Sequence, residues 1–121
     1  MSAEIDLSWV RGETAEWTLT VTDSTGALVD LSSILAAEFE VKVNFGDPDP
    51  ALLHLDLVAG ITILDQTTKT GQLFISATTT QTLSLSQAVY AYDVFITRAD
   101  GGRKRVAWGD LTISDTVNES P

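Results

Sequence analysis

The sequence predicts an all-β protein, an antiparallel sandwich or barrel of about seven to nine short strands. Two observations favour this class. Several segments alternate apolar and polar residues with the period of two that half-buried strands show. Turn-forming residues separate these segments at regular intervals, which is not the pattern of a βαβ protein. With 121 residues and no internal repeat, the chain is expected to form one domain over 1–121, in which 116–121 is a flexible tail.

The first strand is predicted over residues 15–22. Its apolar side chains stand at the odd positions and its polar side chains at the even positions, so one face packs and the other meets water. The turn Asp23-Ser24-Thr25-Gly26 follows, because aspartate supplies an acceptor and glycine tolerates a positive φ. Together with residues 29–32, this opening segment has the pattern of a β-hairpin.

A second long strand is predicted over 37–45, where Ala, Phe and Val alternate with charged and polar residues. Before it, residues 31–36 favour a single helical turn capped by a serine. After it, Gly46-Asp47-Pro48-Asp49-Pro50 is expected to break the sheet, because proline cannot donate a hydrogen bond to a neighbouring strand.

Shorter strands are predicted in the middle of the chain. Leucines alternate with polar residues over 53–57, two isoleucines begin a strand at 61–63, and 71–76 forms another. The threonine-rich segment 78–83 gives two conflicting signals. Thr78 is a suitable cap for a short helix or 3₁₀ turn, but β-branched threonines are poor helix formers.

Residues 89–97 place apolar side chains on both faces, as a central strand does. Asp100-Gly101-Gly102 predicts a hairpin turn into a strand over 103–108, in which Val106 and Trp108 share a face. A bend at Gly109-Asp110 is then expected to lead into a last strand that contains Leu111 and Ile113.

The composition excludes several classes of protein. Hydrophobic residues make up 44% of the chain, too many for a disordered protein, and no apolar run is long enough to span a membrane. There is no cysteine and no signal-peptide pattern, so we expect folding in a reducing cytoplasm. The formal net charge of −10, from 17 acidic and 7 basic residues, disfavours nucleic acid and anionic lipid as partners.

The candidates for catalysis or metal binding are few. His54 is the only histidine, and it stands in the polar register of a leucine-rich strand without a nucleophile motif. Zinc sites usually need several His or Cys ligands. Asp47 and Asp49 flank a proline in a loop, but calcium needs six to eight oxygen ligands and no EF-hand loop is present. We therefore predict a protein that is not an enzyme and has no cofactor or metal.

Two groups of residues are candidates for binding a partner. Trp9 and Trp108 stand near strand ends, where aromatic rings serve the core, a protein contact or a platform for sugar rings, whereas Trp17, Tyr90 and Tyr92 share the register of core residues. A basic cluster surrounds the Asp100-Gly101-Gly102 turn and is either a solvated hairpin tip or a docking patch for an acidic neighbour. It consists of Arg98, Arg103, Lys104 and Arg105.

The order of these motifs resembles that of small β-sandwich domains in tailed-bacteriophage structural proteins, including the amino-terminal domain of baseplate upper proteins. The segments that carry the resemblance are Asp6-Leu7, Arg11-Gly12-Glu13-Thr14, the strand that ends at Val21, the turn 23–26, Val29-Asp30-Leu31-Ser32, Gly71-Gln72-Leu73-Phe74-Ile75, Tyr90-Ala91-Tyr92-Asp93-Val94 and Gly109-Asp110-Leu111-Thr112-Ile113. The resemblance implies an immunoglobulin-like fold and a virion component without an active site.

We therefore expect a structural protein of a phage or prophage particle, assembled in the host cytoplasm, that contacts other virion proteins or copies of itself. The chain lacks the long extension of baseplate proteins, so an adaptor, a capsid decoration protein or a tail accessory protein is as compatible with the sequence as a true baseplate subunit. Edge strands offer a further way to join a neighbour's sheet. The candidate docking residues are Trp9, Asp47, Asp49, Arg98, Arg103, Lys104, Arg105 and Trp108. A carbohydrate-binding module for cell-surface glycans is the alternative.

Overall fold

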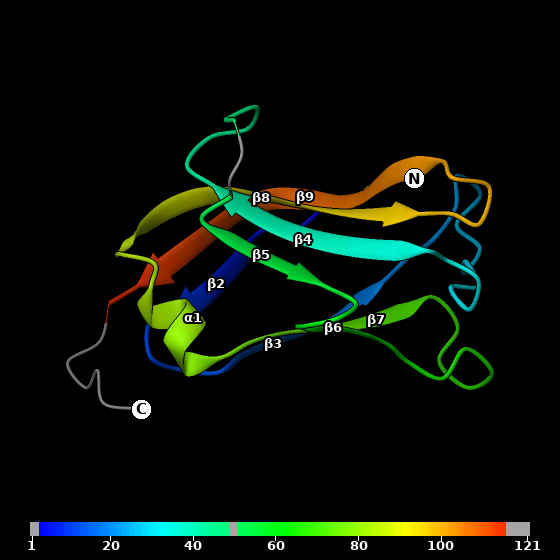
Figure 1. Ribbon diagram of the computed structural model, residues 1–121, viewed down its shortest axis with the longest axis horizontal. Coiled ribbons are helices and arrows are strands. Elements are labelled where there is room, and N and C mark those ends of the chain that lie inside the picture. The colour runs from blue at the N-terminus through cyan, green and yellow to red at the C-terminus, as the bar shows by residue number, and fades with distance from the viewer. Residues whose placement is uncertain (1–2, 49–50, 116–121) are drawn as a thin grey trace.

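The computed structural model describes residues 3–48 and 51–115, whose strands form two sheets that pack against each other (Figure 1). The fold is all-β, as predicted, and the described residues include one short helix, α1 (Thr79–Leu83). Asp49 and the predicted tail 116–121 lie outside the described residues.

The larger sheet has the strand order β1-β9-β8-β4-β5, and β2 also pairs with β9. Its strands are β1 (Ala3–Glu4), β2 (Leu7–Val10), β4 (Ala36–Lys42), β5 (Leu53–Asp56), β8 (Ala88–Thr97) and β9 (Arg103–Ser114). The smaller sheet has the order β3-β7-β6, with strands β3 (Ala15–Thr20), β7 (Gln72–Ala77) and β6 (Ile61–Ile63). These orders match the G-F-C-C′ and B-E-D strands of a variable-type immunoglobulin domain. The chain is an immunoglobulin-like β-sandwich.

The sandwich is not wholly antiparallel, which corrects the prediction. Both β1 and β2 run parallel to β9. The chain steps from β1 to β2 at Ile5 and Asp6, directly beside Gly109: the Ile5 N–H donates to the Trp108 carbonyl at 2.8 Å, and the Asp110 N–H donates to the Asp6 carboxylate at 3.1 Å. A β-carbon at Gly109 would overlap the Ile5 carbonyl, so glycine allows the two backbones to approach each other this closely.

The turn of the predicted opening hairpin is confirmed, but the predicted pairing of its two arms as strands is wrong. The Asp23 carboxylate accepts from the N–H groups of Thr25 and Ala27, at 2.8 and 3.1 Å, and Gly26 has a φ of 86°. The returning arm forms only a bridge between Thr22 and Leu28, while β3 pairs with β7 in the smaller sheet. The arm ends early because side chains take over its hydrogen bonds, as where the Asp30 carboxylate accepts from the Ser32 N–H at 2.9 Å.

The strand predicted over 37–45 ends earlier, at Lys42, because the backbone turns at Gly46, where φ is 82°. Residues 32–33 form a turn and not the predicted helical turn.

The conflict over 78–83 is resolved in favour of a helix by a complete capping box: the Thr78 hydroxyl accepts from the Gln81 N–H at 3.2 Å, and the Gln81 side chain accepts from the Thr78 N–H at 2.8 Å.

A β-bulge separates the two ends of the β8–β9 ladder. Val94 lies opposite Ala107, but Phe95 lies opposite Arg105, so Val106 is an extra residue in β9. The predicted shared face of Val106 and Trp108 is therefore wrong: Val106 is buried and Trp108 is half-exposed on the outer face of the sheet. The expected bend at Gly109-Asp110 is absent, because β9 continues through these residues.

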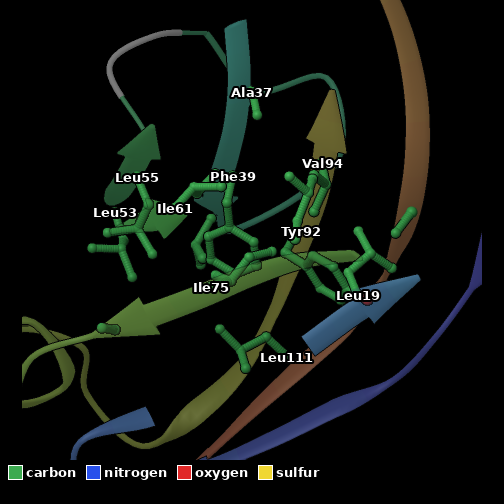
Figure 2. Packing of buried hydrophobic residues seen from close by; sticks show 14 of the residues in the cluster. Leu19, Ala37, Phe39, Leu53, Leu55, Ile61, Ile75, Tyr92, Val94 and Leu111 are labelled. Atoms are coloured by element: carbon green, nitrogen blue, oxygen red, sulfur yellow. The ribbon is translucent and has the colours of Figure 1, made fainter. Parts of the chain in front are cut away.

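An aromatic stack lies at the centre of the core. Figure 2 shows Phe39 and Tyr92 of the larger sheet near Leu19 and Ile75 of the smaller one. The ring of Phe39 stacks on that of Tyr92, with centroids 5.4 Å apart, and on that of Trp9 at 5.7 Å. Antibody domains place an inter-sheet disulfide and a tryptophan in this part of the fold. In this cysteine-free chain, Tyr92 also meets Trp17 of the smaller sheet edge-on, with ring centroids 5.9 Å apart, so an aromatic contact links the two sheets.

The start of β8 has the hydrogen bond of a tyrosine corner. The Tyr90 hydroxyl donates to the Ser86 carbonyl at 2.8 Å and lies 3.1 Å from the Ser86 hydroxyl. In immunoglobulin-like domains this bond fixes the loop that enters the F strand. The bond fixes the start of β8, which lies between β9 and β4 in the larger sheet.

We expect Gly109→Ala to lower the free energy of unfolding by roughly 1–3 kcal/mol, because the new methyl group forces the Ile5 backbone away. Urea denaturation measures the change. Gly26→Ala is the control for the backbone cost of replacing a glycine, since φ at Gly26 is 86° but the added β-carbon meets no atom within 4 Å; its loss should be the smaller of the two. Equal losses of unfolding free energy for the two variants would show that the close approach of Ile5 to Gly109 is unimportant for stability.

Candidate functional site

The outer face of the larger sheet, which is turned away from the smaller sheet, carries a hollow of about 550 Å³. Ligand pockets of proteins typically have this size. Strands β4 and β8 form its floor, and the loop after β4 closes one end. The side chains that give it chemical character are Glu38, Glu40, Lys42, Phe45, Asp93, Phe95 and Arg103.

One row of side chains runs straight across the floor. His54 of β5 lies opposite Glu40 of β4, Glu40 lies opposite Asp93 of β8, and Asp93 lies opposite Trp108 of β9. Like charges directly opposite each other on neighbouring strands destabilise a sheet. The Glu40–Asp93 pair is therefore a local cost, which the nearby cations Arg105, Lys42 and Arg103 act against.

Asp93 is the half-buried carboxylate of this row. Desolvation raises its pKa above the ordinary aspartate value, and the charge of Glu40 raises it further, whereas Arg105, Lys42 and Arg103 act in the opposite direction. Among the described residues, no N–H or O–H group is seen to donate to the Asp93 carboxylate. Its oxygens are therefore open to a donor that enters the hollow.

Aromatic rings and arginines form the walls. Phe45 packs edge-on against Trp108, with ring centroids 5.9 Å apart. The guanidinium of Arg105 lies 5.0 Å from the centre of the Trp108 ring, and that of Arg103 lies 4.3 Å from the centre of the Phe95 ring. Both distances are typical of cation–π contacts. Phe45 remains 48% exposed and is the most accessible ring of the hollow.

The loop after β4 is fixed by hydrogen bonds to Asp47. The Asp47 carboxylate accepts from the Asn44 N–H, and its carbonyl accepts from the Lys42 ammonium, both at 2.9 Å. These bonds hold Phe45 over the end of the hollow. The Lys42 side chain lies opposite Ala91, whose short side chain leaves the space above the floor open.

His54 lies outside the hollow, at the edge of the sheet. Its Nδ1 is 2.8 Å from Glu40 and its Nε2 is 3.2 Å from Asp56. Partial burial alone lowers the pKa of His54, but the two carboxylates outweigh it and raise the pKa above the usual histidine value. With both ring nitrogens engaged by carboxylates, the imidazole has no site left to accept a proton from a hydroxyl nucleophile.

Glu38, Glu40 and His54 form the one group within the described ranges whose potential metal-ligand atoms all lie within 4.8 Å of one another. Zinc coordination by one imidazole and two carboxylates is chemically reasonable. In this arrangement, however, Glu40 already pairs with His54, and Glu38 pairs with Arg103 at 3.4 Å. A cation would have to displace both ion pairs.

Of the predicted docking residues, Arg103 lines the hollow, Trp108 stands beside it against Phe45, and Arg105 lies over the Trp108 ring. Asp47 supports the adjoining loop. Arg98 and Lys104 are exposed near the hairpin tip, and Arg98 lies 3.6 Å from Asp100. That these residues bind a partner stays a prediction.

Trp9 was wrongly predicted as a docking residue. Only 7% of it is exposed, because β2 pairs with β9 and turns the indole onto Phe39 in the core.

Sequence reasoning missed Glu40, Phe45, Asp93 and Phe95 as parts of a site. The alternation over 89–97 already placed Asp93 and Phe95 on the face opposite Tyr92, which was the available signal. Their neighbours on other strands depend on the pairing register, which a single sequence does not contain.

A comparison with protein-family models finds no match, and a comparison with curated proteins finds none either. Three solved structures are similar in fold only. CopC from Methylosinus trichosporium OB3b is 12% identical, with a TM-score of 0.42, covering 82% of this chain and 96% of its own. Murine CRIg is 10% identical, with a TM-score of 0.41, covering 90% of this chain and 92% of its own.

The third structure is a sialyltransferase from Photobacterium damsela, 18% identical with a TM-score of 0.38. The match covers 94% of this chain but only 18% of the sialyltransferase.

None of the helices in the described part of the chain has the length and apolar character needed to cross a bilayer.

We expect the raised pKa of His54 to make stability depend on pH. Because the folded-state pKa lies above the unfolded value, the imidazolium stabilises the fold fully below about pH 6.5 and loses this contribution as pH rises through the folded pKa. The side chain is 40% exposed, so solvent screening limits the effect to roughly 0.5 kcal/mol. Urea unfolding at pH 6 and pH 8 measures it, and His54→Gln should remove the difference between the two.

We expect Asp93→Asn to stabilise the protein at pH 7 by up to about 1 kcal/mol, because it removes a desolvated charge opposite Glu40. The raised pKa of Asp93 gives the matching pH dependence: the penalty is present above the folded pKa and disappears as pH falls through it. Thermal unfolding at pH 7 and pH 4 tests both statements. A variant less stable than the parent at pH 7 would show that Asp93 is a structural residue.

Proposed function

We propose that this protein is a non-enzymatic structural component of a bacteriophage or prophage particle, an adaptor, tail accessory or decoration protein. It binds neighbouring virion proteins through the hollow and its rim on the outer face of the larger sheet. The observation that carries this proposal is the group of aromatic and arginine side chains there, in which Phe45 is exposed and Trp108 and Arg105 are half-buried. Aromatic residues and arginine are the residues most enriched at the energetic centres of protein interfaces.

The charge distribution supports a protein partner. The rim carries both signs, with Glu38 and Glu40 on one side and Arg103 and Arg105 on the other. Such mixed polar rims surround the apolar centres of protein interfaces. A net charge of −10 disfavours a nucleic acid in the same place.

The resemblance to tailed-phage β-sandwich domains supports the setting in a virion. Its segments fall on parts of the chain that form the sandwich: residues 71–75 lie at β7, 90–94 lie within β8 and 109–113 lie within β9. They carry the scaffold, whereas the residues of the hollow supply the specificity in our proposal.

The carbohydrate-binding alternative is less well supported. Sugar rings stack on open aromatic faces. Here Arg105 and Arg103 lie over the rings of Trp108 and Phe95, and Trp9 is buried. Of the rings at the hollow, Phe45 alone is exposed and is not covered by an arginine, which suits a protein anchor better than a sugar platform that needs several open rings on one face.

We expect mass spectrometry of purified particles to detect this chain, and Phe45→Ala and Trp108→Ala each to lower its incorporation at least about tenfold, the loss typical of hot-spot residues. Val58→Ala is the control, because Val58 is 96% exposed but lies outside the hollow. Each variant is supplied in place of the parent protein during particle assembly, and its unfolding curve is recorded separately.

Particles that contain none of the parent protein would overturn the proposal. Glycan-array binding by the parent that is lost in Trp108→Ala, together with absence from particles, would favour the carbohydrate-binding module instead.

A further inference from the structure

We infer that the hollow binds the cationic side chain of a partner protein, an arginine that the partner projects from an extended segment. This inference rests on the proposed function and names the chemical group that the binding face recognises. The guanidinium would lie between Glu40 and Asp93, beside the exposed ring of Phe45.

The floor of the hollow carries two carboxylates directly opposite each other, near three cations of the chain that lower the pKa of Asp93 through their charge. Glu40 and Asp93 lie directly opposite each other, and Asp93 is half-buried without a donor among the described hydrogen bonds. A carboxylate in such a place is stabilised by an incoming group that is both positively charged and a hydrogen-bond donor.

The cations of the chain that line the hollow are engaged elsewhere. The Lys42 ammonium donates to the Asp47 carbonyl at 2.9 Å. The Arg103 guanidinium lies 3.4 Å from Glu38 and over the Phe95 ring. Arg105, Lys42 and Arg103 lower the pKa of Asp93 through their charge, and among the described residues none of them is found hydrogen-bonded to it. A donor for Asp93 is therefore left to come from solvent or from another molecule.

The geometry favours a guanidinium over an ammonium group. A planar guanidinium has five N–H donors, so it can bond two carboxylates at once while its face stacks on an aromatic ring. Asp93 offers one carboxylate, Glu40 offers the oxygen that does not contact His54, and Phe45 offers the ring at one end of the same hollow. An ammonium group is a compact, more strongly hydrated charge and makes less use of the ring.

The hollow is open to solvent along the outer face and has about 550 Å³ of space, enough for one long side chain and the backbone beside it. An extended partner segment presents alternate side chains to such a face. One arginine would then enter the hollow while its neighbours contact the rim near Trp108 and Arg105.

The test titrates the isotope-labelled full chain with the capped pentapeptide acetyl-Ser-Ala-Arg-Ala-Ser-amide and follows the backbone amide signals of β4 and β8 by NMR. We expect saturable shifts centred on Glu40 and Asp93. A peptide with citrulline in place of arginine keeps the shape but loses the charge, and we expect its dissociation constant to be at least tenfold higher.

Two variants separate the hollow from the overall charge of the protein. Asp93→Asn should weaken arginine-peptide binding at least tenfold. Glu16→Gln removes the same charge from an exposed position on β3, in the other sheet, and should leave binding within twofold of the parent. Both variants are checked for a parent-like amide spectrum before the titration.

Absence of saturable shifts overturns the inference, and so does equal binding of the citrulline peptide or equal weakening by Asp93→Asn and Glu16→Gln. The proposed function fails separately. If Phe45→Ala and Trp108→Ala abolish incorporation into particles while the arginine peptide does not bind, the face is a protein interface that recognises another group.

Discussion

The alternation of side chains along β8 determines both the centre of the core and the outer face of the larger sheet. Tyr92 enters the core and stacks on Phe39, with ring centroids 5.4 Å apart. Because successive side chains of a strand point to opposite faces, the next residue, Asp93, must stand on the outer face of the larger sheet. There the pairing register places it between Glu40 and Trp108. The aromatic stack in the core and the charged floor of the hollow are thus on opposite sides of one short segment of β8.

The sequence was sufficient for the parts of the fold that local patterns determine. The alternation over 15–22 and 89–97 predicted β3 and β8, and Asp23 with Gly26 predicted a turn that is present. These predictions succeed because burial on one face and turn chemistry both act over a few residues. The choice of partner strand acts over long distances, which is why β3 pairs with β7 and not with the arm after its own turn.

The candidate site was less predictable for the same reason. Trp108 and Arg105 were recognised, but the bulge at Val106 decides which face each of them occupies, and no local pattern announces it. The row of His54, Glu40 and Asp93 joins three strands that are far apart in the sequence. Trp9 failed as a docking residue because parallel pairing of β2 with β9 turned its ring into the core. A like-charge pair on a sheet face is the kind of local conflict that proteins retain at functional sites.

The central claim is that Asp93 is a partly desolvated carboxylate held opposite Glu40 on an open face of the sheet. Its most direct test is the pKa of Asp93, measured from the NMR shift of the side-chain carboxyl carbon as pH is varied, in the parent and in Glu40→Gln. We expect a pKa above the ordinary aspartate value of about 4 in the parent, and a lower pKa in Glu40→Gln. An ordinary or depressed pKa in the parent, unchanged by Glu40→Gln, would contradict it.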